Sequence, residues 1–132
     1  MEIVKDFPPN IAEIEKVFPL KGRELFAYGN IIYNPSGLNI PNELIAHECV
    51  HQEQQGENVE SWWKRYLTDP EFRYVMELEA HQIEYQVFCE SEKDRNVRAK
   101  YLMAIASRLS GPLYGGNVFS LKEARKQISA RN

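Results

Sequence analysis

The stretch His47-Glu48-Cys49-Val50-His51 forms an HExxH pattern and contains two of the three histidines of the chain. In an α-helix, residues four apart lie on one face, one turn apart, so His47 and His51 can direct both imidazoles at one ion. Glu48 lies about 100° around the helix from His47, where it can reach a water on that ion without binding the ion itself. The stretch therefore predicts a metal site with a general base beside it.

The residues around this stretch favour a helix that begins near Pro41 and stops at Gly56. Proline suits the first helical turn and glycine is a common helix end. Leu44, Ile45 and Val50 supply apolar positions between the two ends. Cys49 falls about 200° from His47 on a helical wheel, so we expect it to point away from the metal and into the core.

A second helix is predicted from the sequence that follows Thr68-Asp69-Pro70. Asp69 is a typical N-cap, and Pro70 suits the first helical position. No glycine or proline interrupts residues 71–89. The helix is therefore expected to run to about Cys89.

This second helix can supply a further ligand, because a catalytic zinc takes three protein ligands and one open position. Glu77 and His81 share one face of its helical wheel, together with Glu84. Glu79 lies about 200° around the helix from Glu77, so the two glutamates cannot both face the ion. The helical phase favours Glu77 as the third ligand.

The HExxH pattern, followed 26 residues after His51 by a glutamate in a second helix, resembles the gluzincin metallopeptidases. In that family the second helix carries ExxxD, whose Glu is the third zinc ligand and whose Asp orients the first zinc histidine. By this resemblance, which covers roughly residues 24–88, Glu77 is the third ligand and His81 stands at the Asp position. His81 either accepts a hydrogen bond from His47 or ligates the metal itself. The small size of the chain also resembles small metallopeptidase-like proteins of phages and bacteria.

The resemblance implies an α+β, mainly α, minimal zincin-like domain with a small β-hairpin or sheet before the HExxH helix. It implies a peptidase that acts on a peptide or protein substrate and binds one Zn²⁺ per chain through His47, His51 and Glu77. Glu48 is expected to take the proton of the metal-activated water and to deliver it to the leaving amine.

Three further residues are candidates for a donor that stabilises the oxyanion. They are Tyr114, Tyr33 and Arg73. Gln55, one turn beyond His51, is expected to contact substrate or to lie in solvent.

Residues 24–33 are rich in aromatic and β-branched side chains and are broken by Gly29-Asn30, which favours two short strands or a hairpin. By the resemblance, Ile31–Tyr33 is the expected sheet edge for an extended peptide bound by strand addition. Other helices are expected over about 10–17, 59–67 and 94–110 and from Ser120 onward. The glycine-rich loop 111–116 is expected to be a connection that can also shape a site.

The chain has 132 residues, 43% of them hydrophobic, which favours a single domain over 1–132. It has no apolar run of about 18 residues, so no membrane-spanning helix is expected. The mixed, charged start is not typical of a signal peptide. Cys49 and Cys89 are therefore expected to be reduced thiols in a cytoplasmic protein.

The net charge of −3 is distributed unevenly. Residues 1–90 hold 7 Lys/Arg against 16 Asp/Glu, whereas residues 91–132 hold 9 against 3. The basic part is expected to pack on the acidic part or to lie in solvent. No nucleic-acid-binding motif accompanies it, so nucleic acid is an unlikely partner.

Two alternatives to an active peptidase stay open at this level. One is a zincin-like domain that binds metal or a partner without catalysis, which His81 as a fourth ligand would favour and the presence of Glu48 disfavours. The other is an interaction protein that uses the basic C-terminal region. The sequence does not specify the substrate or the oligomeric state.

Overall fold

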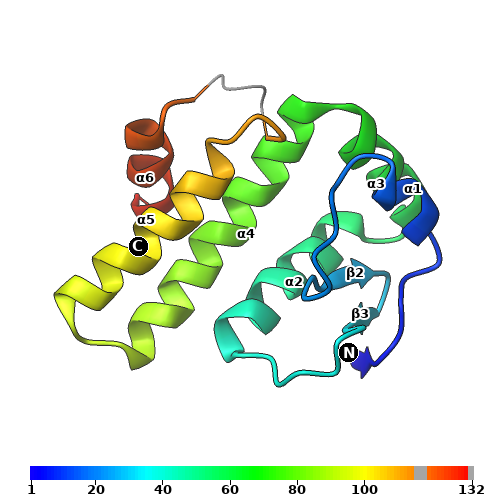
Figure 1. The fold of residues 1–132 in the computed structure, drawn as a ribbon, viewed down its shortest axis with the longest axis horizontal. Helices are drawn as coiled ribbons and strands as arrows, with labels where there is room; N and C mark the ends of the chain where they lie inside the picture. Colours follow the sequence, from blue (N-terminus) through cyan, green and yellow to red (C-terminus); the bar gives the residue numbers. More distant parts are fainter. Residues whose placement is uncertain (115–118, 131–132) are drawn as a thin grey trace.

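The computed structural model describes residues 1–114 and 119–130. Within them, helices predominate over one small sheet, which confirms the predicted α+β, mainly α, class (Figure 1). In chain order the elements are β1 (Glu2–Val4), α1 (Ile11–Glu15), β2 (Phe26–Tyr28), β3 (Ile31–Tyr33), α2 (Asn42–Gln55), α3 (Val59–Thr68), α4 (Pro70–Ser91), α5 (Arg95–Leu109) and α6 (Leu121–Ser129). No helix among the described residues combines the length and the apolarity needed to cross a membrane.

The long helix α4 lies at the centre of the molecule, with α2 on one side and α5 and α6 on the other (Figure 1). Its start follows the sequence: the Asp69 side chain accepts hydrogen bonds from the backbone N–H groups of Glu71 and Phe72, and Pro70 occupies the first turn. These bonds satisfy amide groups that have no partner inside the helix. The start of α4, and with it the direction in which each side chain points, is thereby fixed.

The sheet has the order β1-β3-β2, with β1 parallel and β2 antiparallel to β3. The sequence did not predict β1, which is only three residues long and mostly exposed. Because β3 has a neighbouring strand on each side, the prediction that Ile31–Tyr33 is an open edge is wrong. On β2, the Ala27 carbonyl accepts hydrogen bonds from Gln55 Nε2 at 2.7 Å and Trp63 Nε1 at 3.0 Å. That carbonyl is therefore already engaged and is not open to an added strand.

Gln55 joins the last turn of α2 to the sheet. Its Oε1 accepts the backbone N–H of Gly29 at 2.8 Å while its Nε2 donates to Ala27, and the side chain is 1% exposed. The expectation of a solvent-exposed or substrate-contacting glutamine is wrong, because the β2–β3 turn covers this end of the helix. Gln55 instead fixes the position of α2 relative to the strands.

Two apolar clusters flank the polar face of α4. The first comprises Ile14, Phe26, Trp62, Trp63 and Tyr66. The second comprises Tyr74, Ile105, Ala106, Leu109, Ala124 and Ile128. Helix α4 contributes Tyr74 to the second cluster and packs Phe72 and Met76 against the first. The basic C-terminal helices thus pack on α4, as expected.

Cys49 lies on a different side of α2 from the histidines, as predicted, but not in the core. The side chain is half-buried, and its Sγ lies 3.4 Å from Sδ of Met1. The N-terminal residue folds back over this face of the helix. The exclusion of Cys49 from the metal site therefore agrees with the structure, and the expected core position does not.

Candidate metal centre

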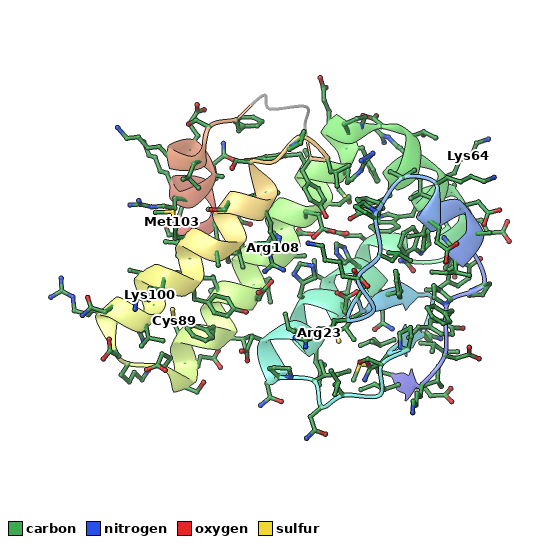
Figure 2. All side chains as sticks on the ribbon, viewed as in Figure 1. Arg23, Lys64, Cys89, Lys100, Met103 and Arg108 are labelled. Atoms are coloured by element: carbon green, nitrogen blue, oxygen red, sulfur yellow. The ribbon has the colours of Figure 1, made fainter. Side chains whose placement is uncertain are left out.

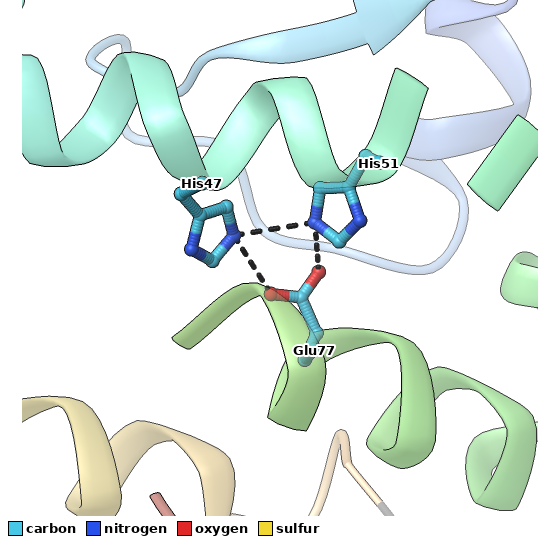
Figure 3. A group of neighbouring side chains, drawn as sticks. All are labelled: His47, His51 and Glu77. Carbon is cyan, nitrogen blue, oxygen red and sulfur yellow. Dashed lines mark hydrogen bonds and ion pairs between the residues drawn. The ribbon is translucent and has the colours of Figure 1, made fainter. Parts of the chain in front are cut away.

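His47 and His51 of α2 and Glu77 of α4 meet at the interface between the two helices (Figure 3). The two Nε2 atoms are 3.2 Å apart. Glu77 places Oε1 3.1 Å from Nε2 of His47 and Oε2 3.0 Å from Nε2 of His51. All three side chains are buried. Glu77, which follows His51 by 26 positions, thus lies beside both histidines of α2.

The spacing of these atoms suits a metal ion. Two ligands bonded at about 2.05 Å to a tetrahedral zinc lie about 3.3 Å apart. The imidazole and carboxylate atoms of His47, His51 and Glu77 lie 3.0 to 3.2 Å apart. Two histidines and one glutamate are also the ligand set of several catalytic zinc sites. The residues present can therefore hold a divalent metal ion.

Hydrogen bonds behind the two histidines turn their Nε2 atoms toward Glu77. Nδ1 of His47 donates to Oε1 of Glu84 at 2.8 Å, and Nδ1 of His51 donates to Oε1 of Gln54 at 2.9 Å. An outward Nδ1–H bond fixes the ring orientation and leaves Nε2 as the atom that can bind a metal. Gln54 is itself held through bonds from its Nε2 to Met76 O and Glu79 Oε1.

Glu84 holds the position that the resemblance gave to His81. Its side chain is 1% exposed and accepts hydrogen bonds from His47, His81 and the Tyr101 hydroxyl. The expectation that His47 donates to His81 is wrong, because the carboxylate of Glu84, one turn further along α4, reaches His47 first. The helical wheel places Glu84 on the face of Glu77 and His81, but no pattern in the sequence indicated a role for it.

His81 lies beside the cluster rather than behind it. Its Nδ1 donates to Glu84 at 2.9 Å, while its Nε2 lies 3.8 Å from Oε1 of Glu77. Its ring packs edge-on against His47 with 4.7 Å between centroids. Burial lowers the pKa of His81 and favours the neutral imidazole. Its Nε2 is thus a neutral nitrogen near Glu77.

Tyr66 of α3 is a member of the site that sequence analysis missed. Its hydroxyl donates to Oε2 of Glu77 at 2.7 Å, and its ring stacks on Trp62 with 4.9 Å between centroids. Burial, followed by the charge of Glu77, raises the pKa of Tyr66 well above its usual range. The phenol therefore stays protonated and holds the Glu77 carboxylate in place. The aromatic residues of 59–67 predicted core packing first and a substrate pocket wall as the alternative, and Trp62, Trp63 and Tyr66 do both, since they belong to the first apolar cluster and also line the cavity.

Opposite charges stabilise each other within the cluster. Burial is the largest single effect and would lower the pKa values of His47 and His51, but Glu77 and the neighbouring carboxylates together outweigh it and raise both. Burial would likewise raise the pKa of Glu77, but His51 and His47 hold it well below its usual range. Without a metal, protons on the imidazoles compensate the buried carboxylate.

Glu48 differs from the other buried glutamates of the site. Its Oε2 lies 3.9 Å from Nε2 of His47, and within the described part of the chain no residue donates a hydrogen bond to its carboxylate. Burial is the largest effect on Glu48 and raises its pKa. A carboxylate with a raised pKa, beside the cluster but not engaged in it, is suited to accept and release a proton.

The cluster lies in a cavity of about 640 Å³. Helices α2 and α4 contribute the cluster residues, including Glu48 and Glu77, to its lining. The segment 18–25 forms one wall and the loop from Gly111 to Tyr114 forms another. This loop thus shapes the site, as sequence analysis allowed; its residues 115–116 lie outside the described residues.

Of the three predicted oxyanion donors, only Tyr114 lines the cavity. Burial raises its pKa to about 12, so it is a neutral donor at physiological pH. Tyr33 packs against the first apolar cluster. Arg73 is buried and donates to the carbonyls of Tyr66 and Leu113. It holds the loop that carries Tyr114 and does not face the cavity.

The helical phase predicted for α4 agrees with the structure. Glu77 faces the two histidines, whereas Glu79 is exposed and accepts a hydrogen bond from Gln54. A second group of atoms close enough to hold a metal ion consists of His47, His81 and Glu84. Since Nδ1 of both histidines already donates to Glu84, we assign this second group to the support of the first.

No family model, curated protein or solved structure matches this chain.

Proposed function

We propose that the protein is a zinc-dependent, peptidase-like hydrolase of the gluzincin type. The observation that supports this most is the arrangement of His47, His51 and Glu77, whose facing atoms lie 3.0 to 3.2 Å apart beside a buried Glu48. A structural metal site has no use for a base and usually has a closed shell of four ligands. Three ligands facing a large cavity suit a catalytic site better.

A zinc ion bound by these residues would lower the pKa of a water molecule toward about 7 and so supply a nucleophile at neutral pH. Glu48 would accept the proton from this water and pass it to the leaving amine. The raised pKa of Glu48 supports this role, because it moves the carboxyl group nearer to the pH at which both transfers are efficient. Tyr114 is the proposed donor to the developing oxyanion.

The competing proposal is a metal-binding domain without catalysis. It is supported by His81, whose neutral Nε2 lies 3.8 Å from Oε1 of Glu77 and could become a fourth ligand after a small movement. Four protein ligands would close the shell to water. The cavity beside Glu48 favours the catalytic proposal.

Elemental analysis tests the metal. We expect about one zinc per chain after gentle purification, and protein that takes up no zinc at neutral pH would contradict the proposal. Because imidazole and carboxylate ligands are not selective, the protein should be reconstituted with zinc before activity is measured.

A matched pair of variants tests the chemistry. We expect Glu48→Gln to reduce turnover of a mixture of internally quenched peptides by about 10²–10⁴-fold and to leave zinc affinity nearly unchanged. Glu53→Gln makes the same chemical change on an exposed position of the same helix and should retain activity. Equal turnover by Glu48→Gln and wild type would exclude the role of Glu48. No cleavage of any peptide by zinc-loaded wild type would favour the non-catalytic domain.

A further inference from the structure

The cavity has positively charged side chains on opposite walls. Arg23 and its neighbour Lys21 belong to the segment 18–25 on the α2 side, and Arg108 belongs to α5 on the α4 side. Figure 2 shows both labelled side chains on the central part of the molecule, in contrast to Lys64 and Lys100 near its outer ends. The metal cluster lies between the elements that carry the two arginines.

Neither guanidinium group forms an ion pair with a carboxylate of residues 1–114 and 119–130. The ion pairs there involve the histidines of the cluster and the pair Arg65–Asp69. Glu24, the carboxylate nearest in sequence to Arg23, accepts instead the backbone N–H groups of Lys21 at 2.7 Å and Gly22 at 2.9 Å.

The acidic side chains of the cluster are also engaged elsewhere. Glu77 is bound by His47, His51 and Tyr66. Glu84 accepts hydrogen bonds from two histidines and Tyr101. Glu48, which also lines the cavity, lies 3.9 Å from His47, and among the described residues none of the four carboxylates of the lining forms an ion pair with Arg23 or Arg108.

The pKa values of Tyr101 and Tyr114 indicate which part of the cavity the charge of Arg108 reaches. Burial raises the pKa of Tyr114 to about 12, and the charges of Arg73 and Arg108 oppose that rise. Burial and Glu84 raise the pKa of Tyr101, and Arg108 again opposes the effect. Arg108 thus lies close enough to influence two hydroxyl groups on the same side of the site.

We infer that the substrate is an acidic peptide, with a carboxylate beside the bond to be cleaved that binds Arg23 or Arg108. This inference rests on the proposed function and specifies its substrate class. Guanidinium groups pair well with carboxylates because their donors match both oxygens. Apolar side chains of the same walls, Phe18, Leu25 and Leu113, would pack against neighbouring residues of the peptide.

Calorimetry with two chelating probes tests the inference on the zinc-loaded protein. The probes are acetyl-Leu-Glu hydroxamate and acetyl-Leu-Gln hydroxamate, which share a metal-binding group and differ in one charge. We expect the Glu probe to bind about fivefold tighter, the scale of one partly exposed ion pair, and less so at high salt. The double variant Arg23→Gln/Arg108→Gln should bind both probes equally. Each single variant then shows which arginine binds the carboxylate.

Lys64→Gln/Lys100→Gln is the control, because it removes the same charge from exposed positions outside the cavity lining. It should keep the preference for the Glu probe. Equal binding of both probes by wild type, or a preference that survives in the double arginine variant, would overturn the inference and leave the metal site intact. Binding of neither probe would overturn the proposed function and this inference together.

Discussion

Nδ1 of His47 lies 2.8 Å from Oε1 of Glu84, a residue 37 positions further along the chain. This bond crosses from α2 to α4 and fixes the ring of the first histidine of the HExxH pattern. Glu84 also binds His81 and Tyr101, so one buried carboxylate supports the cluster of His47, His51 and Glu77 from behind.

The first prediction concerns this bond. Glu84→Ala should weaken zinc binding by about 10–100-fold, because His47 would lose the partner that directs its Nε2 toward Glu77. Zinc titration against a competing chelator measures the change. Glu84→Gln should recover part of the affinity, since its amide oxygen can still accept one hydrogen bond. An affinity equal to that of wild type in Glu84→Ala would contradict the role.

The second prediction separates two neighbouring glutamates. Glu77→Ala should lower zinc affinity far more than Glu79→Ala, because only Glu77 faces the two histidines. Glu79→Ala should have a small effect, since Glu79 is exposed and its bond to Gln54 places it one residue removed from His51. Parallel zinc titrations decide between them. A larger loss in Glu79→Ala would mean that α4 is rotated relative to the structure described above.

The third prediction is a pH dependence of zinc affinity. The pKa values of His47 and His51 are raised in the metal-free protein, so zinc must displace protons from the imidazoles at and above pH 6.5. The pKa of Glu77 is lowered, so Glu77 is ionised in this range and releases no proton. Zinc affinity should therefore increase as pH rises from about 6 and level off above the raised histidine pKa values. Titrations between pH 6 and 9 measure this, and a flat profile would argue against the charge arrangement.

The fourth prediction concerns the junction of α2 with the sheet. Gln55→Ala should lower the free energy of unfolding by about 1–3 kcal/mol, because the half-buried N–H of Gly29 would lose its partner. The Ala27 carbonyl would keep its bond from Trp63. Denaturant unfolding measures the effect. Gln52→Ala, on the same helix but outside this junction, is the comparison, and equal losses in both variants would contradict the argument.

Helical periodicity and capping could be predicted from the sequence alone. The fixed rotation per residue places His47 and His51 on one face, sets Glu48 beside them and separates Glu77 from Glu79. The Asp69-Pro70 pair specifies where α4 begins. These properties depend on neighbours within one or two turns, and the structure agrees with them.

The contacts between side chains of different elements could not be predicted in this way and became clear from the packing of the helices. Helical phase gave Glu77, His81 and Glu84 one face, but the packing of α2 on α4 selected Glu84, not His81, as the partner of His47. The Tyr66–Glu77 bond likewise required α3 to pack beside α4. The physical reason is that the position of one element relative to another follows from the packing of all their side chains, which local periodicity does not contain.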